Sequence, residues 1–359
     1  FCLSRGLGDV YKRQSLGRQI GVAVVGYGFM GTTHLTAWSM VEDAKVLAVV
    51  GRDRIKAEKV ASRFDAVSYS TLGQALKELA VDAVDICTPT FTHRDYALEA
   101  LNAGKHVLVE KPMALSLREA DEMIQVADAG GLKLMVAHVL RFFSEYAKVR
   151  ELVQGGAIGR PVMVRAKRAG SMPPWGVQSW FMDQSKSGGV AVDLAAHDVD
   201  FLRWCLQDEV EDVFALSHRL VTRETFVDDH VLMVLRFRKG AIAHVEASWA
   251  MPTALPFTTS LEVAGSSGSL SVDNESTPPL TIVNRRGVQR FSPETRPWVE
   301  GMPFSIDPFY GEVQHFADCV INDRKPITDG RESRRSLEVI LAAAESAATG
   351  EPITLQAEA

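Results

Sequence analysis

The most regular pattern along the chain is a series of short, mostly apolar runs separated by longer stretches with helical periodicity. Runs of about four to eight residues that are rich in β-branched side chains are typical of strands buried on both faces, as in a parallel sheet. Alternation of such strands with helices predicts a doubly wound α/β domain in the first part of the chain, residues 19–139. The predicted strands are residues 20–25, 46–50, 83–87, 105–109 and 132–139.

Polar residues mark the starts of two helices in this part of the chain. Thr92 is placed to cap a helix whose apolar face runs to Gly104. Ser116 and Glu119 form a capping box that opens the next helix, and Gly130 ends it. Both helices therefore fit between predicted strands, as crossover connections do.

From residue 160 onward apolar and polar positions alternate, as expected of a sheet with one exposed face. Glycine and serine at 265–268 predict a tight turn between two of these strands. Two amphipathic stretches, 309–320 and 332–348, are predicted helices that close the second domain, residues 140–359, against the first. The predicted strands are residues 162–166, 231–235, 241–245, 261–264 and 269–272.

A glycine motif follows the first predicted strand. Residues 26–31 read G-x-G-x-x-G and lie between that strand and a stretch that fits a helix. Gly26 permits a tight turn, Gly28 lets the backbone approach a pyrophosphate, and Gly31 allows the helix to pack closely on the strand. The N-terminus of the helix offers unpaired N–H groups to phosphate. Strand, glycines, helix and second strand in this order predict dinucleotide binding.

The end of the second strand bears on which nicotinamide cofactor is bound. An acidic residue there would accept hydrogen bonds from the adenosine ribose and repel a 2′-phosphate. This chain has Gly51 and Arg52 at that point, which leaves room and positive charge for a 2′-phosphate and favours NADP(H). Asp53 is close enough in sequence to reach the ribose instead, and Arg52 could be a surface side chain, so NAD(H) stays open.

Composition narrows the class of protein. The 359 residues are 46% hydrophobic and 23% charged, and the net charge of −6 comes from acidic and basic residues interleaved along the chain. Without a basic stripe, nucleic acid and anionic membranes are not expected partners. No apolar run approaches the roughly 20 residues of a membrane helix. The four cysteines form no C-x-x-C pair, so we expect neither a disulfide framework nor a zinc site, and a cytoplasmic protein.

The first residues stand apart from both domains. Residues 1–14 match neither helix nor strand periodicity and lack the apolar core and cleavage site of a signal peptide. We expect residues 1–18 to be a leader, adaptor-derived or disordered, that contributes nothing to the fold.

Three polar residues are candidates for chemistry. Lys111 follows a predicted parallel strand, at the sheet edge where ligands bind in open α/β sheets. A lysine there can donate hydrogen bonds to a substrate oxygen and, if partly desolvated, exchange protons. Asp193 and His197 are four apart in an apolar stretch, so on a helix they would share one face. A surface lysine, a carboxylate near a helix start and a locally satisfied core histidine are the plain alternatives.

These residues do not amount to a metal site. A carboxylate and a histidine four apart can be two ligands, but no third residue has a spacing typical of zinc or iron sites, so we expect no metal. Asp198 and Asp200 are expected to hold the helix or face solvent, and a position of one of them in the cleft stays open. We expect structural or cofactor-side roles, rather than metal ligation, for His34, His93 and His138.

With these motifs the chain resembles the glucose–fructose oxidoreductase/inositol dehydrogenase/MocA (Gfo/Idh/MocA) family from residue 19 to about residue 355. The motifs are the glycines at 26–31, C-T-P-T at 87–90 with His93, G-K-H-V-L-V-E-K-P at 104–112, and G-G-V at 188–190 with Asp193 and His197. The resemblance implies a Rossmann domain, a second α/β domain with a large, mostly antiparallel open sheet, and an active site between them. It also implies a homo-oligomer, a dimer or tetramer, formed through the face of the second sheet that lies away from the cofactor.

The resemblance also implies site residues. Lys111 would be the catalytic lysine of the E-K-P motif, with Asp193 and His197 as its partners, and the Lys111–Pro112 bond would be cis. The loop at 88–89 would pass beneath the nicotinamide. The residues expected to contact NAD(P)(H) are Gly26, Gly28, Phe29, Met30, Gly31, Arg52, Thr88, Pro89, Thr90, His93, Glu110 and Lys111.

An aromatic loop precedes the G-G-V motif and is a candidate wall for a sugar ring. Trp175 and Trp180 are its tryptophans, although loop aromatics also pack against their own domain. Arg141 and Tyr310 are further substrate-binding candidates, on the family resemblance alone.

The resulting hypothesis is hydride transfer between a nicotinamide and a secondary hydroxyl or ketone of a sugar, inositol or related polyol. His197 would remove the hydroxyl proton, Lys111 would hydrogen-bond the oxygen, and Asp193 would orient the pair, with the roles of His197 and Lys111 interchangeable. Two alternatives remain: a redox-assisted glycosidase or eliminase that recycles its NAD, and a non-catalytic cofactor-binding regulatory protein.

Overall fold

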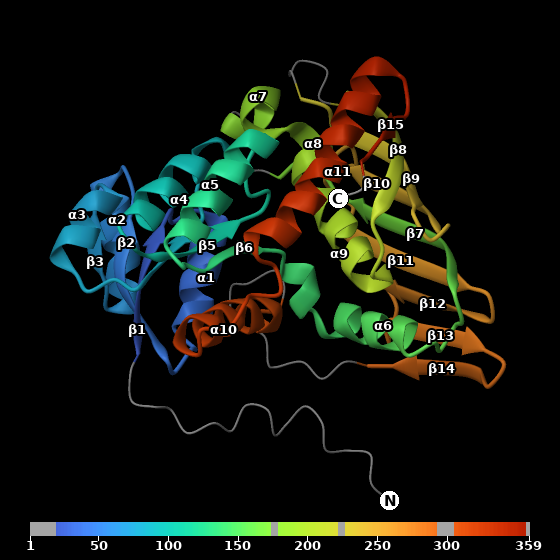
Figure 1. Ribbon diagram of the computed structural model, residues 1–359, viewed down its shortest axis with the longest axis horizontal. Coiled ribbons are helices and arrows are strands. Elements are labelled where there is room, and N and C mark those ends of the chain that lie inside the picture. Colours follow the sequence, from blue (N-terminus) through green and yellow to red (C-terminus); the bar gives the residue numbers. More distant parts are fainter. Residues whose placement is uncertain (1–18, 174–178, 222–226, 293–304, 357–359) are drawn as a thin grey trace, which may run out of the picture.

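Residues 19–173, 179–221, 227–292 and 305–356 are described by a computed structural model, and they contain two sheets (Figure 1). The first sheet has six parallel strands in the order β3-β2-β1-β4-β5-β6, which confirms the predicted Rossmann fold. All five predicted strands are present, and a short sixth strand joins them at the edge. The strands are β1 (Ile20–Val25), β2 (Ala44–Val50), β3 (Val67–Tyr69), β4 (Ala83–Ile86), β5 (His106–Glu110) and β6 (Leu134–Ala137).

Helices connect these strands, and their starts differ in part from the prediction. The prediction that Thr92 caps a helix is wrong, because its hydroxyl lies 2.7 Å from both Thr88 Oγ1 and the Pro89 carbonyl oxygen. Ser116 does cap the next helix, accepting from the Glu119 amide. The helical elements are α1 (Phe29–Trp38), α2 (Arg54–Ala61), η1 (Ser62–Phe64), α3 (Leu72–Glu78), η2 (Thr90–Thr92), α4 (His93–Asn102), α5 (Leu117–Ala129) and η3 (Val139–Phe142).

The second sheet has nine strands in the order β14-β13-β12-β11-β7-β10-β9-β8-β15. Only β10 and β7 pair in parallel, so the sheet is mostly antiparallel, as the resemblance implied. The predicted hairpin is confirmed, with Gly265 opposite Gly268. The strands are β7 (Pro161–Ala169), β8 (Val210–His218), β9 (His230–Phe237), β10 (Ile242–Ser248), β11 (Thr258–Gly265), β12 (Gly268–Asp273), β13 (Leu280–Asn284), β14 (Gly287–Phe291) and β15 (Ile353–Thr354).

Helices lie between the two sheets, on one face of the second sheet (Figure 1). Residues that alternate along β9 and β10 are buried toward these helices, and their neighbours are exposed on the other face. Among the described residues, no helix meets the length and hydropathy needed to cross a membrane. The helices of this part of the chain are α6 (Ser144–Gln154), η4 (Trp180–Met182), α7 (Gln184–Ser187), α8 (Gly189–Asp193), α9 (Ala196–Leu206), α10 (Asp307–Ile321) and α11 (Gly330–Thr349). Of these, α6, α8, α9 and α11 contact the second sheet.

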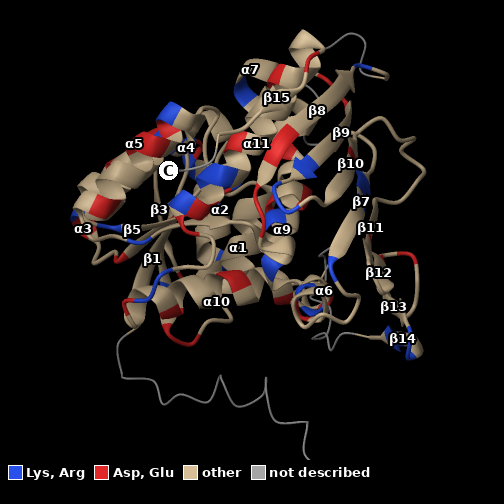
Figure 2. Cartoon of the chain, turned by 45° about the vertical axis from the view of Figure 1, so that its right-hand side comes forward, with Lys and Arg blue, Asp and Glu red and all other residues tan. Residues whose placement is uncertain are grey.

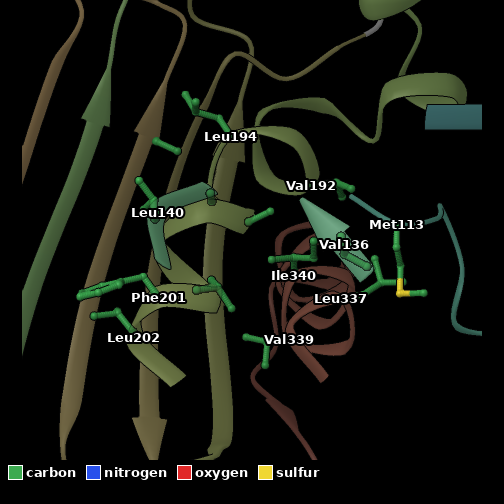
Figure 3. Packing of buried hydrophobic residues seen from close by; sticks show 14 of the residues in the cluster. Met113, Val136, Leu140, Val192, Leu194, Phe201, Leu202, Leu337, Val339 and Ile340 are labelled. Atoms are coloured by element: carbon green, nitrogen blue, oxygen red, sulfur yellow. The ribbon is translucent and has the colours of Figure 1, made fainter. Parts of the chain in front are cut away.

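One continuous core joins the two halves of the molecule (Figure 3). Met113 and Val136 come from the first half, Val192 comes from α8, and Leu337 and Ile340 come from α11. Helix α10 packs along α1, and α11 packs against α5 and β6. Acidic and basic residues are interspersed on the helices (Figure 2). The fold therefore holds the carboxyl edge of the first sheet firmly against α8 and α9.

Candidate active site

Lys111 and Asp193, 82 residues apart in the sequence, are in direct contact. Lys111 follows the last residue of β5, and its Nζ donates to Asp193 Oδ1 at 3.0 Å and to the Asp193 carbonyl oxygen at 2.8 Å. The expectation that Asp193 and His197 share one helix is wrong, because α8 ends at Asp193 and α9 begins at Ala196. The break leaves the Asp193 carbonyl free of a helical N–H, and the lysine ammonium uses it.

His197 lies in the first turn of α9 and is neutral at physiological pH. Burial, together with the nearby positive charges of Lys111 and Arg168, lowers its pKa well below the usual value. Its Nδ1 is buried and has no hydrogen-bond partner among the described residues. A neutral imidazole beside an ammonium group can accept a proton, which is what a general base requires.

The two aspartates that follow His197 anchor α9. Asp198 pairs with Arg168 on β7 at 3.1 Å. Asp200 receives two hydrogen bonds from Arg141, at 2.7 and 2.8 Å. Both carboxylates are buried and paired with arginines, so they hold the helix in place, which was one of the roles expected for them.

The expected substrate contact of Arg141 is not supported by its position. Its side chain is 1% exposed and lies in an ion-pair network with Asp200 and Glu332. Its third nitrogen donates to the Ile327 carbonyl. All three nitrogens are thus engaged inside the protein, and the guanidinium stabilises the packing of η3, α9 and α11.

The loop after β4 is braced by His93 at the start of α4. His93 is buried, with Nε2 2.8 Å from the Thr88 carbonyl oxygen and Nδ1 2.9 Å from the Pro112 carbonyl oxygen. The ring therefore ties the loop to the turn that carries Lys111, and that Lys111–Pro112 bond is cis, as implied. The position of His93 makes it a brace between two loops. The neighbouring Thr90 is buried, whereas Pro89 is partly exposed.

The glycine loop fits the phosphates of a dinucleotide. A Cβ on Gly31 would lie 2.2 Å from the Gly26 carbonyl oxygen, so only glycine allows α1 to pack this closely on the loop. A Cβ on Gly28 would have no neighbour within 4 Å, which leaves open space in front of the backbone. No side chain caps α1 at Gly28, so the helix start keeps its positive end for an anion. Phe29, 43% exposed, and Met30 form the first turn.

Two of the aromatic candidates are described. Trp180 is half-buried in η4, and its ring contacts that of Phe91 in η2, with centroids 6.2 Å apart. Tyr310 lies on α10, where its hydroxyl donates to Gln314 at 3.2 Å. Trp175 lies outside the described residues. Phe91, 44% exposed, was not among the candidates, and its place directly after the C-T-P-T motif was the signal that could have drawn attention to it.

Family models match both halves of the chain. Residues 20–138 match the oxidoreductase family with an NAD-binding Rossmann fold, and residues 146–271 match the GFO/IDH/MocA C-terminal domain. The chain belongs to the Gfo/Idh/MocA family. It is therefore an NAD-binding oxidoreductase, as the sequence motifs implied.

Individual members of the Gfo/Idh/MocA family resemble the chain along most of its length. A 1,5-anhydro-D-fructose reductase of Ensifer adhaerens is 31% identical over 80% of this chain and 84% of its own. A scyllo-inositol 2-dehydrogenase (NAD(+)) of Bacillus subtilis is 30% identical over 94% of this chain and 96% of its own. The crystal structure of an oxidoreductase domain protein from Kribbella flavida superposes with a TM-score of 0.85 at 26% identity, covering 95% of this chain and all of that one.

Sequence reasoning missed the role of a buried polar group behind the Gfo/Idh/MocA site. Asp85 interrupts the apolar strand β4 and is fully buried, which was the available signal. Its carboxylate accepts from Trp38 Nε1 at 2.7 Å and contacts His34 Nδ1 at 2.9 Å. Atoms of His34, Asp85 and Cys87 that could bind a metal lie within 4.8 Å of one another. Because the carboxylate is already hydrogen-bonded by protein donors, we interpret the group as a hydrogen-bond network.

Proposed function

We propose that this oxidoreductase transfers a hydride between a nicotinamide and a ring secondary hydroxyl, or the corresponding ketone, of a sugar, inositol or related polyol. The observation that carries the proposal is the contact of Lys111 with Asp193 beside the neutral His197, at the carboxyl edge of the NAD-binding sheet. The relatives named above act on an anhydro-sugar and an inositol, which supports a cyclic polyol as the substrate class.

The chain supplies a donor, a base and an orienting group. Lys111 Nζ has three protons and uses two acceptors on Asp193, so it can donate to a substrate oxygen as well. His197 accepts the hydroxyl proton on oxidation and returns it on reduction. Asp193 holds the ammonium in place through its carboxylate and its carbonyl oxygen. Bound nicotinamide supplies or accepts the hydride.

The finer proposal on the cofactor is that NADP(H) is accommodated. A Cβ on Gly51 would lie 1.9 Å from the ring of Tyr27, so packing of the tyrosine requires glycine at this position. The Asp53 carboxylate caps α2, accepting from the Lys56 amide and lying 3.3 Å from Lys56 Nζ. It is therefore turned toward the helix, while the exposed Arg52 has no ion pair with another described residue. KM values for NAD and NADP, in the wild type and Arg52→Ala, test this: the variant should lose affinity for NADP alone.

The second sheet supports the proposal of a homo-oligomer formed by copies of this chain. Its outer face carries large exposed apolar residues on neighbouring strands, with Leu216 opposite Leu232 and Val234 on the same strand. The Arg165–Glu262 ion pair lies on the same face. A surface with apolar residues and both signs of charge can match a second copy of itself across a two-fold axis. We therefore propose a dimer or tetramer.

Free thiols support a cytoplasmic location, which we also propose. The described cysteines Cys87, Cys205 and Cys319 are all unpaired. Burial raises the pKa of Cys205 to about 12 and that of Cys319 to about 11, so neither is a reactive thiolate. Cell fractionation tests the location.

Lys111→Met, assayed against a panel of inositols, aldoses and anhydro-sugars with NAD and NADP, tests the activity and the role of the lysine. We expect turnover to fall roughly 100-fold or more because the proton-donating contact is lost, with cofactor affinity retained. Lys133→Met is the matched control, since Lys133 is also a partly buried lysine paired with an aspartate, at 2.6 Å from Asp323. Full turnover in Lys111→Met would contradict the proposal, as would product release without net reduced cofactor.

A further inference from the structure

A buried imidazole lies between two carboxylates directly behind the catalytic turn. His34, on α1, has no solvent exposure. Its Nδ1 is 2.9 Å from Asp85 Oδ2, and its Nε2 is 3.1 Å from Glu110 Oε1. The three side chains come from α1, β4 and β5, so the imidazole links the helix of the glycine loop to the two central strands.

The network ends on the backbone of Lys111. Glu110 uses its other oxygen, Oε2, to accept the Lys111 amide at 3.0 Å. The carboxylate therefore faces His34 across an ion-pair contact, in which Nε2 makes no hydrogen bond, and itself accepts from the amide nitrogen of Lys111. From there the side chain reaches Asp193. A shift of the Glu110 carboxylate would move the origin of the Lys111 side chain.

We propose that His34 is a positioning residue for hydride transfer, which as an imidazolium joins Asp85 to Glu110 and thereby fixes the turn that carries Lys111. The inference rests on the proposed role of Lys111. His34 is fully buried and acts through Glu110, so it is distinct from the residues that contact the substrate.

Electrostatics support a charged His34. Burial alone would lower its pKa, but Asp85 reverses this and the pKa is raised well above its usual value. Burial alone would raise the pKa of Glu110, but His34 and Lys111 lower it. One cation thus lies between two carboxylates, in an interior where an unpaired carboxylate would be costly.

Other titratable groups face this cluster from the surrounding elements. Cys87 follows β4, and burial raises the pKa of its thiol, so the thiol is uncharged. His93 begins α4, where burial lowers its pKa while the carbonyl oxygens of Thr88 and Pro112 act in the opposite direction. Glu312 on α10 has one oxygen 4.0 Å from His34 Nε2 and is fully buried. Burial raises the pKa of Glu312 well above its usual value, which favours its neutral form. Lys111, beyond Glu110, adds one positive charge. His34 is therefore the group that lies between Asp85 and Glu110 and offsets their negative charge.

The first variant is His34→Gln, which can donate to one carboxylate but carries no charge. We expect kcat to fall roughly 10- to 100-fold because Lys111 is displaced, with KM and NADH affinity changed by less than about twofold. His315→Gln is the matched control, since His315 is a mostly buried histidine on α10 that accepts one amide, from Ile327, and makes no contact with Lys111. Its kcat should stay at the wild-type level.

The second variant, Asp85→Asn, tests the charge through the pH profile. Removal of the carboxylate that raises the pKa of His34 should let the imidazolium lose its proton at lower pH. The alkaline limb of kcat should then move down by about 1–3 pH units. In the double variant His34→Gln with Asp85→Asn, the limb should match that of His34→Gln alone, because the titrating group is gone.

The results of these variants decide whether His34 positions Lys111. A kcat of His34→Gln within twofold of the wild type, or an alkaline limb that Asp85→Asn leaves in place, overturns the inference. The inference is also overturned if the alkaline limb of kcat differs between His34→Gln and the double variant His34→Gln with Asp85→Asn. If His34→Gln does not fold, the Asp85→Asn profile decides alone. Failure of the proposed function is seen separately, as full turnover in Lys111→Met.

Discussion

His197 is a base whose neutral form is favoured by its surroundings. Because its pKa is lowered well below the usual value of about 6.5, the ring stays unprotonated as the pH falls through that range. We therefore expect the acidic limb of kcat/KM to lie below pH 6.5, with activity lost only under more acidic conditions. A pH series of kcat/KM measures this, and His197→Gln should lower the rate roughly 100-fold or more and remove the limb. A wild-type limb above pH 7, or one that persists in the variant, would contradict the assignment.

Asp200 is a second residue whose environment predicts a measurable effect. Burial alone would raise its pKa, but Arg141 and His138 lower it strongly, so its charged form stabilises the fold at neutral pH. Asp200→Asn leaves the Arg141 guanidinium buried without its main partner, and we expect a loss of about 3–5 kcal/mol in the free energy of unfolding. Because the folded-state pKa lies below the unfolded one, this contribution is present above about pH 4 and is lost as the pH falls further.

Denaturant unfolding at several pH values tests the Asp200 prediction. Asp95→Asn is the control, since Asp95 pairs with Arg94 on the surface and its loss should leave stability unchanged. The variant should also show a weaker dependence of stability on acid pH than the wild type. Equal stabilities of Asp200→Asn and Asp95→Asn would show that the buried pair does not hold α9.

At the scale of elements, the sequence predicts what local patterns determine. Strands such as β1 and β4 were found because both of their faces are buried, which gives continuous apolar runs. The exposed strand β14 and the two-residue strand β15 lack such a signal. The break between α8 and α9 was missed because the spacing of Asp193 and His197 suits a continuous helix. At the break, the Asp193 carbonyl accepts from Lys111, a residue of the first half of the chain that a local pattern does not place there.

Prediction of the candidate site from the sequence is limited in the same way, to what local patterns determine. Lys111, Asp193 and His197 were chosen as candidates from motifs. The role proposed for His34 instead depends on Asp85 and Glu110, which lie on two strands that only the sheet order brings beside α1. Arg141 was a substrate-binding candidate on the family resemblance alone, yet its side chain pairs with Asp200 on α9 and Glu332 on α11, far along the chain. Contacts between distant segments thus account for the residues that the sequence alone did not assign.

The close packing of α1 on the glycine loop gives a prediction at the same scale. Gly31→Ala would place a Cβ 2.2 Å from the Gly26 carbonyl oxygen, and backbone cannot yield as a flexible side chain can. We expect α1 to shift and NADH affinity to fall at least about tenfold, or 1.4 kcal/mol. Fluorescence titration with NADH measures this. Gly73→Ala on α3 is the control, since its Cβ would meet only the end of the Glu99 side chain at 3.1 Å, and it should bind NADH normally.

The whole molecule separates its catalytic and its outer surfaces. The helices between the two sheets cover one face of the second sheet (Figure 1). Leu216, Leu232 and Val234 are exposed on its other face. An interface on this outer face would leave the site accessible and would stiffen the sheet that supports α8 and α9. Assembly and chemistry can therefore be changed independently, and mutation of the outer face should leave turnover per chain intact.

Leu232→Glu tests this separation. Leu232 pairs with Leu216 on β8 and with Glu246 on β10, so the new carboxylate would lie in the middle of the apolar surface and next to an existing one. In a two-fold interface each substitution occurs twice, which doubles its cost. We expect light scattering to show a smaller assembly or a monomer, with NADH affinity retained. Ile55→Glu, at an 82% exposed position on α2, should keep the wild-type mass. A wild type that is monomeric at micromolar concentration, or a variant of unchanged mass, would show that this face does not join copies of the chain.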